Sequence, residues 1–146
     1  MKKQFILSIA ILMVISFSNC KKELDLSTNE YYDVSDFLKS KNCQTKCGIQ
    51  ASCEGKKIRL QGIIDEINVM PSQHVFYLKD HAKDKFKMEI KVDSVISEVI
   101  FDLIQNQLSG KYRIEGIVEG FDKPTNFTCE RGYFMHLIKE SDLSIY

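Results

Sequence analysis

The sequence predicts one mainly β domain with a single substantial helix. From residue 56 onward, five runs rich in β-branched and aromatic residues are separated by turn residues, which is the pattern of strands. One segment, residues 95–108, instead repeats apolar residues at helical spacing, and it lies between the third and fourth runs. The chain that follows the apolar N-terminus, roughly 125 residues, is the size of one domain with one core.

The first two runs predict a pair of strands joined by a short turn. Residues 57–69 form a long β-branched run that is broken by Gly62. Residues 70–73, Met-Pro-Ser-Gln, have turn composition, and residues 74–79 form the second run.

The third run and the helix follow directly. Residues 86–92 alternate apolar and charged side chains, which is typical of a half-buried strand and places Phe86 in the core. Asp93 or Ser94 is expected to cap the helix, and Gly110 to end it in the left-handed conformation. The apolar helix face consists of Val95, Ile96, Val99, Ile100, Leu103, Ile104 and Leu108.

The last two strands are predicted at residues 111–121 and 132–139. Between them, residues 122–131 contain Pro124 and Cys129 and are expected to form a long loop. Residues 143–146 close the chain.

Three shorter segments precede the strands. Residues 31–41 have apolar side chains at helical spacing and predict a short helix. Residues 42–55 form a cysteine-rich loop with Gly48 and Gly55 as breakers. Polar residues 20–30 are expected to be a tether. The predicted organisation is therefore a leader (1–19), a tether (20–30), a short helix with a cysteine-rich segment (31–55) and a β domain (56–146).

Two of the strands match each other around a glycine. Residues 57–65 (Lys-Ile-Arg-Leu-Gln-Gly-Ile-Ile-Asp) align with residues 111–119 (Lys-Tyr-Arg-Ile-Glu-Gly-Ile-Val-Glu). A glycine inside a strand permits a bend or a bulge. With the order β-β-β-α-β-β, this resembles the OB-fold, and in particular the tRNA-anticodon-binding-like (tRNA_anti-like) group. The resemblance implies a five-stranded OB-fold-like barrel plugged by the helix. An SH3-like barrel is the alternative, but it lacks a long helix in that place.

The N-terminus carries a targeting pattern. Lys2 and Lys3 precede an apolar run, residues 5–15, which has the length of a secretory signal and is too short to span a bilayer. Small residues then lead to Cys20. This resembles a bacterial lipoprotein signal, which implies that residues 1–19 are removed and that Cys20 carries diacylglycerol and palmitate-type chains as a membrane anchor. An ordinary cleaved signal, or a signal anchor, is the alternative.

The same resemblance implies a location in the bacterial cell envelope. Lys21, rather than an aspartate, follows the lipidated position. Under the sorting rule known for some bacteria, this favours the outer membrane.

Four further cysteines are expected to be paired. An even number of cysteines in an exported chain predicts two disulfides, in any of three connectivities. Cys129 is expected to pair with Cys47 or Cys53. Paired Cys-x₂-Cys knuckles, the strong zinc pattern, are absent, so no metal is expected; a metal-handling or thiol-redox protein remains the alternative. The candidates are Cys43, Cys47, Cys53 and Cys129.

One face of the second and third strands could bind a ligand. OB-folds use this face, and aromatic side chains beside lysines suit single-stranded nucleic acid. Alternation must bury either Phe76 or Tyr77. Without Lys2 and Lys3 the chain has 18 basic and 20 acidic residues, and this near-neutral balance argues against nucleic acid as a partner. The candidate face is His74, Tyr77, Lys79, Lys85, Lys87 and Lys91.

No motif of a known catalytic site is present. The sequence contains no Gly-x-Ser-x-Gly, no His-Glu-x-x-His and no phosphate-binding loop. We therefore expect a non-catalytic binding or assembly module without a cofactor, which attaches to the membrane through its N-terminal lipid. Its ligand is expected to be an envelope protein, a peptide or a glycan.

Overall fold

A computed structural model describes residues 21–70, 73–107 and 109–146, so the leader and Cys20 lie outside the described residues. Strands dominate these ranges, which confirms the mainly β prediction. The elements are β1 (Tyr32–Asp33), α2 (Val34–Lys39), η2 (Lys41–Cys43), β2 (Lys57–Met70), β3 (Gln73–Lys79), β4 (Met88–Val92), α3 (Ser97–Asn106), β5 (Lys111–Pro124), β6 (Cys129–Leu137), η3 (Glu140–Asp142) and β7 (Leu143–Ile145).

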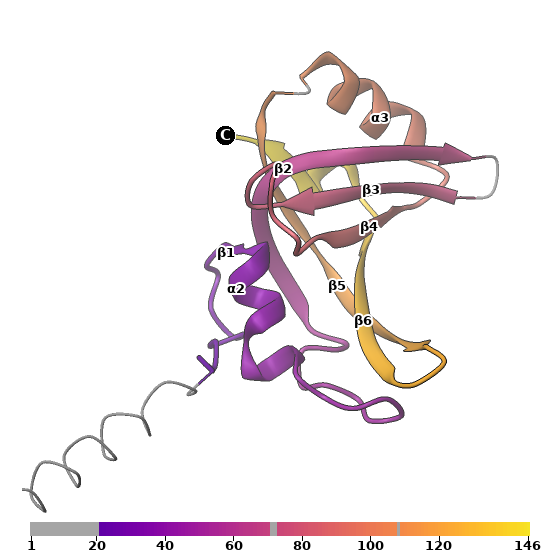
Figure 1. The fold of residues 1–146 in the computed structure, drawn as a ribbon. Coiled ribbons are helices and arrows are strands. Elements are labelled where there is room, and N and C mark those ends of the chain that lie inside the picture. The colour runs from indigo at the N-terminus through magenta and orange to yellow at the C-terminus, as the bar shows by residue number, and fades with distance from the viewer. Residues whose placement is uncertain (1–20, 71–72, 108) are drawn as a thin grey trace, which may run out of the picture.

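Five strands pair in a closed ring. β2 pairs with β3, and β3 with β4, both antiparallel. β4 then pairs with β6 in parallel, and β6 with β5 antiparallel. The antiparallel pairing of β5 with β2 returns to the first strand. In Figure 1, α3 lies at the top of this ring, whereas the N-terminal segment and the β5–β6 hairpin lie at its bottom.

The two matched glycines lie where the long strands change neighbours. β2 pairs with β5 up to Ile63 and with β3 from Ile63 onward, and Gly62 stands at this change. A methyl group on Gly62 would overlap the carbonyl oxygen of Lys79 in β3. Gly116 is placed equivalently in β5, where a methyl group would overlap the carbonyl oxygen of His136 in β6. The repeated glycine was predicted to permit a bend or a bulge, and in the structure it also allows close backbone approach at the ring closure.

The hydrophobic core is one cluster, to which the ring of strands and the segments packed against it both contribute side chains. It includes side chains of α3 and of the N-terminal segment together with those of the strands. Tyr112, Phe37 and Phe76 are among its largest fully buried side chains. The Tyr112 hydroxyl donates to the Gln107 carbonyl oxygen at 2.7 Å, which satisfies its polar atom inside the core.

Helix α2 is held against the ring by a distant carboxylate. Asp80 follows β3, and its two carboxylate oxygens accept the N–H groups of Val34 at 2.5 Å and Ser35 at 2.9 Å. These are donors of the first turn, which have no partner within a helix. The helix also buries Val34 and Phe37, so its position depends on the ring and not on its own six residues.

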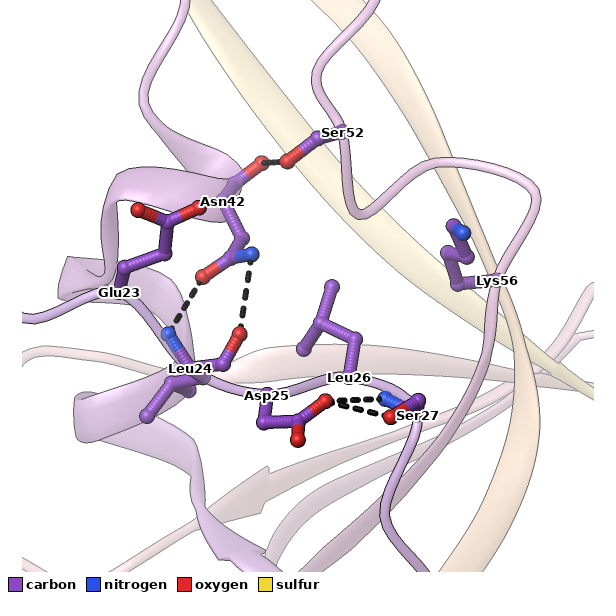
Figure 2. A pocket seen from close by; sticks show the side chains of 8 residues that line it. All are labelled: Glu23, Leu24, Asp25, Leu26, Ser27, Asn42, Ser52 and Lys56. Carbon is purple, nitrogen blue, oxygen red and sulfur yellow. Dashed lines mark hydrogen bonds between the residues drawn. The ribbon is translucent and has the colours of Figure 1, made fainter.

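The segment predicted as a tether packs against the domain from Leu24 onward. The Leu24 N–H donates to Asn42 Oδ1 at 2.8 Å, and Asn42 Nδ2 donates back to the Leu24 carbonyl at 3.3 Å (Figure 2). The Asn42 carbonyl accepts the Ser52 hydroxyl at 3.2 Å. Both Leu24 and Asn42 are buried, and the Asn42 side chain joins the N-terminal segment to the cysteine-rich loop.

A charged group, which we call the loop clamp, fastens the cysteine-rich loop to the β5–β6 hairpin. Arg131 donates to both oxygens of Glu54, at 3.0 and 2.6 Å, and to Asp122 at 2.8 Å. Asp122 also accepts the Gly48 N–H at 3.1 Å. Burial acts to raise the pKa of the Glu54 carboxyl, but hydrogen bonds from Arg131 and from the Ala51 N–H outweigh it and hold the pKa below its ordinary value.

The prediction that Phe86 lies in the core is wrong. Its side chain is 41% exposed, and the Lys39 ammonium lies 4.5 Å from the ring centroid. β4 begins only at Met88, because residues 80–87 form the irregular connection from β3. The alternating pattern therefore extended two residues beyond the strand.

The prediction of a long loop at residues 122–131 is also wrong. β5 and β6 continue as a hairpin whose register pairs Asp122 with Arg131 and Pro124 with Cys129. Only residues 125–128 turn, and the Thr125 hydroxyl accepts the Thr128 N–H at 2.8 Å within that turn. Pro124 is the last residue of β5 and stands directly before this turn, so the predicted loop began three residues too early and ended three residues too late.

The helix ends differ in detail from the prediction. α3 begins at Ser97, and Asp93 instead accepts the Val95 N–H at 2.9 Å in the preceding turn. Gly110 does not have the expected left-handed φ, whereas Gly48 and Gly55 do, at 75° each. The Gly110 N–H donates to the Gln107 carbonyl at 2.9 Å, and Gly110 lies close to Ile145. Close packing therefore explains a glycine at this position better than a left-handed conformation does.

We expect Gly62→Ala and Gly116→Ala each to lower the free energy of unfolding by about 1–3 kcal/mol, because the new methyl group displaces a paired strand. Urea unfolding of the two variants measures this. Ser144→Ala, on an exposed position of β7, is the control and should change the value by less than about 0.5 kcal/mol. Unchanged stability in both glycine variants would contradict the close approach.

We expect Glu54→Gln to lower the free energy of unfolding at pH 7 by about 1.5–3 kcal/mol, since Arg131 loses a charged acceptor. The pKa of such a carboxyl is lower in the folded chain than in the unfolded chain. It therefore stabilises the fold at pH values above the unfolded-state pKa, and this stabilisation is lost as the pH falls through the folded-state pKa. The difference from the parent should therefore shrink on acidification. Glu23→Gln, an exposed carboxylate, is the control. A deficit that stays constant down to acid pH would exclude this role.

Candidate binding face

Four of the six predicted face residues come together on the outside of the ring. Phe76 and Leu78 are fully buried, so alternation turns Tyr77 and Lys79 outward and resolves the choice between Phe76 and Tyr77. Lys91 lies on the same side of β4. The Lys87 ammonium lies 3.9 Å from the centroid of the Tyr77 ring.

The other two predicted residues lie elsewhere. His74 is three positions from Tyr77 and therefore on the opposite side of β3, where its ring centroid is 6.2 Å from that of Phe101 in α3. Lys85 is exposed in the β3–β4 connection, because β4 begins at Met88. The predicted face thus loses these two positions.

Strands β5 and β6 add aromatic side chains that sequence reasoning missed. The parallel register of β4 with β6 sets Phe134 opposite Glu89 and His136 opposite Lys91. The Phe134 ring lies 5.2 Å from that of His136 and 5.9 Å from that of Phe121 in β5. The outer face, as we use the term below, comprises Tyr77, Lys79, Lys87, Glu89, Lys91, Phe121, Phe134 and His136.

Lysine side chains lie over three of these rings, and the Lys123 ammonium is 5.1 Å from the centroid of Phe121. The Lys91 ammonium lies 3.5 Å from the centroid of the Phe134 ring, and the Lys87 ammonium lies 3.9 Å from that of the Tyr77 ring. The attraction between an ammonium and a ring face is about 0.5–1 kcal/mol at exposed sites. A ligand can therefore displace these lysines at small cost and reach the aromatic surface beneath.

The cations of the outer face already have carboxylate partners. Lys79 pairs with Asp65 at 2.5 Å, Lys87 with Glu66 at 2.6 Å, and Lys91 with Glu89 at 3.8 Å. In the same way, His136 Nε2 lies 3.3 Å from Glu119. The hydrogen bond to Glu66 raises the pKa of the Lys87 ammonium, and that from Lys79 lowers the pKa of the Asp65 carboxyl. The face is thus locally balanced in charge.

A β-bulge in β2 brings one of these carboxylates to the face. The β2–β3 register shifts between Asp65 and Ile67, and the extra residue, Glu66, has a φ of 54°. Bulges re-aim side chains and are frequent near functional sites. Here the bulge presents Glu66 to Lys87, which lies over Tyr77.

A pocket of about 500 Å³ adjoins the outer face at the ends of β3, β4 and β6. It is bordered by two imidazoles, His74 and His136, and by the carboxylates of Glu89 and Asp93. His74 is therefore close to the face although it points to the other side of its strand. The mixture of donors and acceptors suits an uncharged polar group better than an anion.

A second hollow, of about 570 Å³, lies under the N-terminal segment (Figure 2). None of the described residues that line it is aromatic, and the docked backbone around Leu24 forms one wall. We therefore favour the outer face as the binding site. The hollow is lined by Glu23, Leu24, Asp25, Leu26, Ser27, Asn42, Ser52 and Lys56.

Among the described cysteines one pair is bonded, whereas two disulfides were predicted. Cys47 and Cys129 form a disulfide with a Cα–Cα distance of 5.9 Å, in agreement with the predicted pairing of Cys129. Cys43 and Cys53 are buried thiols. Asp122 lies near the disulfide, and its carboxylate and the two sulfurs are within 4.8 Å of one another. Because these sulfurs are bonded to each other, they are not thiolates and do not offer a metal site.

Within the described ranges, no helix combines the length and the apolar character needed to cross a bilayer.

Solved structures show how the fold relates to known proteins. An aspartyl-tRNA synthetase from Entamoeba histolytica is similar with a TM-score of 0.51 and 11% identity, over 88% of this chain and 24% of the synthetase. A DUF3299 family protein from Pseudomonas aeruginosa PAO1 has a TM-score of 0.44 and 13% identity, over 88% and 97%. An OBody bound to hen egg-white lysozyme has a TM-score of 0.46 and 14% identity, over 70% and 95%.

The chain thus spans about a quarter of the synthetase that it resembles. No protein-family profile matches the sequence, and no curated protein does. At this identity the likeness shows the fold alone. Together with the closed ring of strands, it supports an OB-like fold.

Proposed function

We propose that this protein is a lipid-anchored binding or assembly module of the bacterial cell envelope, without catalytic activity. Its ligand is an envelope protein, a peptide or a glycan, and the outer face binds it. The observation that carries this proposal is the cluster of aromatic rings on the outer face, covered by lysines that are themselves paired with carboxylates.

The chemistry of the outer face favours these ligands. Aromatic rings supply contact area, whereas balanced charges and a nearby pocket supply donors and acceptors for peptide or sugar groups. A groove that follows single-stranded nucleic acid needs an excess of positive charge along the backbone. On this face Lys79, Lys87 and Lys91 are already neutralised. Nucleic acid is therefore not the proposed partner.

The proposed anchor at Cys20 would hold the domain close to the bilayer. Leu24 is buried against the domain, so only residues 21–23 lie between it and Cys20. An extended chain gains at most 3.6 Å per residue, which limits the reach from Cys20 to Leu24 to about 14 Å. The ligand would therefore be a component at the membrane surface.

The alternative is a cysteine-based metal-handling or thiol-redox protein of the envelope. Metal ligation and thiol exchange both require thiolates. The bonded pair Cys47–Cys129 has none, and the thiols of Cys43 and Cys53 are buried. This alternative therefore has less support than the binding module, which would keep its activity without any thiolate.

We expect mass spectrometry of the mature protein to find Cys20 at the N-terminus with its thiol and amine acylated. Cys20→Ser should abolish the modification and release the protein from the membrane fraction, because one residue carries the whole anchor. Asn19→Ala, which keeps the cysteine, is the matched control and should remain lipidated. An unmodified N-terminus at any other residue would disprove the anchor.

We expect a photo-crosslinking amino acid at position 77 to capture a partner in the intact envelope. The same group at position 95, where Val95 is 87% exposed in the turn before α3, is the control and should capture little. The double variant Tyr77→Ala, Lys91→Ala should reduce recovery of the partner by about tenfold, a loss typical of central interface residues. Capture from position 95 without capture from position 77 would place binding elsewhere.

A further inference from the structure

The cysteine-rich loop contains two unbonded, buried thiols, those of Cys43 and Cys53. Cys43 and Cys53 are 3% and 0% exposed. The Cys53 N–H donates at 3.1 Å to the Asn42 carbonyl, which belongs to the peptide group that joins Asn42 to Cys43. The Cys53 thiol is near enough to the Cys43 thiol to act on its pKa. Backbone and side chains thus bring the two residues together.

This environment is unsuited to reactive thiolates. The hydrogen bond with Cys53 and burial both raise the pKa of the Cys43 thiol. A thiol that stays protonated neither ligates a metal nor attacks a disulfide at neutral pH. The Cys43 carbonyl, in turn, accepts the Tyr133 hydroxyl at 2.6 Å, so the segment is fixed from the β6 side. Such a pair is suited to a stable structural bond.

We propose that Cys43 and Cys53 form a second disulfide of the mature protein. The bond is made before the loop packs, when both thiols are accessible to a small-molecule or protein disulfide as oxidant. One thiolate attacks a sulfur of the oxidant to give a mixed disulfide, and the second thiolate displaces the remaining oxidant thiol. The two cysteines lose two protons and two electrons, and the oxidant is reduced to two thiols.

The second bond would complete the attachment of the N-terminal segment. Cys47 lies between Cys43 and Cys53 in the sequence, and its bond to Cys129 reaches the β5–β6 hairpin. The second bond would close the same loop onto the segment that holds Asn42, and hence onto Leu24. An oxidising compartment follows from the proposed envelope location, but the pairing itself is testable on the purified protein.

The test uses the full chain with Cys20→Ser, Cys47→Ser and Cys129→Ser, which leaves only Cys43 and Cys53. The chain is equilibrated with reduced and oxidised glutathione, folded in buffer and unfolded in urea, and free thiols are then alkylated. Trypsin cleaves after Lys46, so a bond joins peptide 42–46 to peptide 47–56. Circular dichroism shows whether the variant is folded.

We expect the bond to form at least about tenfold more favourably in the folded chain than in urea, which corresponds to about 1.4 kcal/mol. By linkage, the bond would raise the folding equilibrium by the same factor. Equal or weaker pairing in the folded chain, or glutathione adducts on both cysteines, would overturn the proposal.

A second chain keeps the proposal testable if the variant does not fold. The full chain with Cys20→Ser alone retains all four cysteines and is folded in the same glutathione buffer. Peptide 42–46 should then be joined to the complex that contains peptide 47–56 and the hairpin peptide 114–131. An alkylated, unattached peptide 42–46 would overturn the second disulfide while leaving the proposed binding function untouched.

Discussion

The rest of the structure depends on the closure of the strand ring between β2 and β5. Each of these strands has 14 residues and pairs with two other strands of the ring, so each must bend as it passes from one to the other. Gly62 and Gly116 allow that bend because a backbone carbonyl of the third strand occupies the space of a side chain. Closure brings β6 beside β4, which sets Phe134 and His136 opposite Glu89 and Lys91, 45 residues earlier in the chain, and so assembles the outer face.

The outer face and the N-terminal segment have opposite physical characters. The rings lie under lysines whose own side chains are partly exposed, so a ligand can displace the lysines and reach the rings. The N-terminal segment is instead fixed by several specific contacts: the Asp80 carboxylate at α2, the buried Asn42 at Leu24, and the loop clamp with its adjacent disulfide. A rigid attachment on one side and an adaptable surface on the other is the arrangement expected of a module held close to a membrane.

Much of the fold was predictable because its patterns are local. The alternation around Met88 and Ile90, the helical spacing of α3 and the repeated glycine each follow from the neighbouring residues. The candidate face was only partly predictable. Phe134 joins Tyr77 through the parallel β4–β6 pairing, which no local pattern encodes. Two predictions were wrong because a local pattern and a strand had different ends. The alternation that placed Phe86 in the core began before β4, whereas the loop composition around Pro124 began before β5 ended.

The central claim, that the outer face binds a component of the envelope, is tested most directly by the reactivity of two histidines. His136 lies on the outer face, and His81 is exposed in the β3–β4 connection. Both are modified with an imidazole-acylating reagent, once in intact envelope and once in the purified protein. The account predicts that His136 is protected in the envelope whereas His81 reacts equally in both. Equal reactivity of His136 in the two preparations would contradict it.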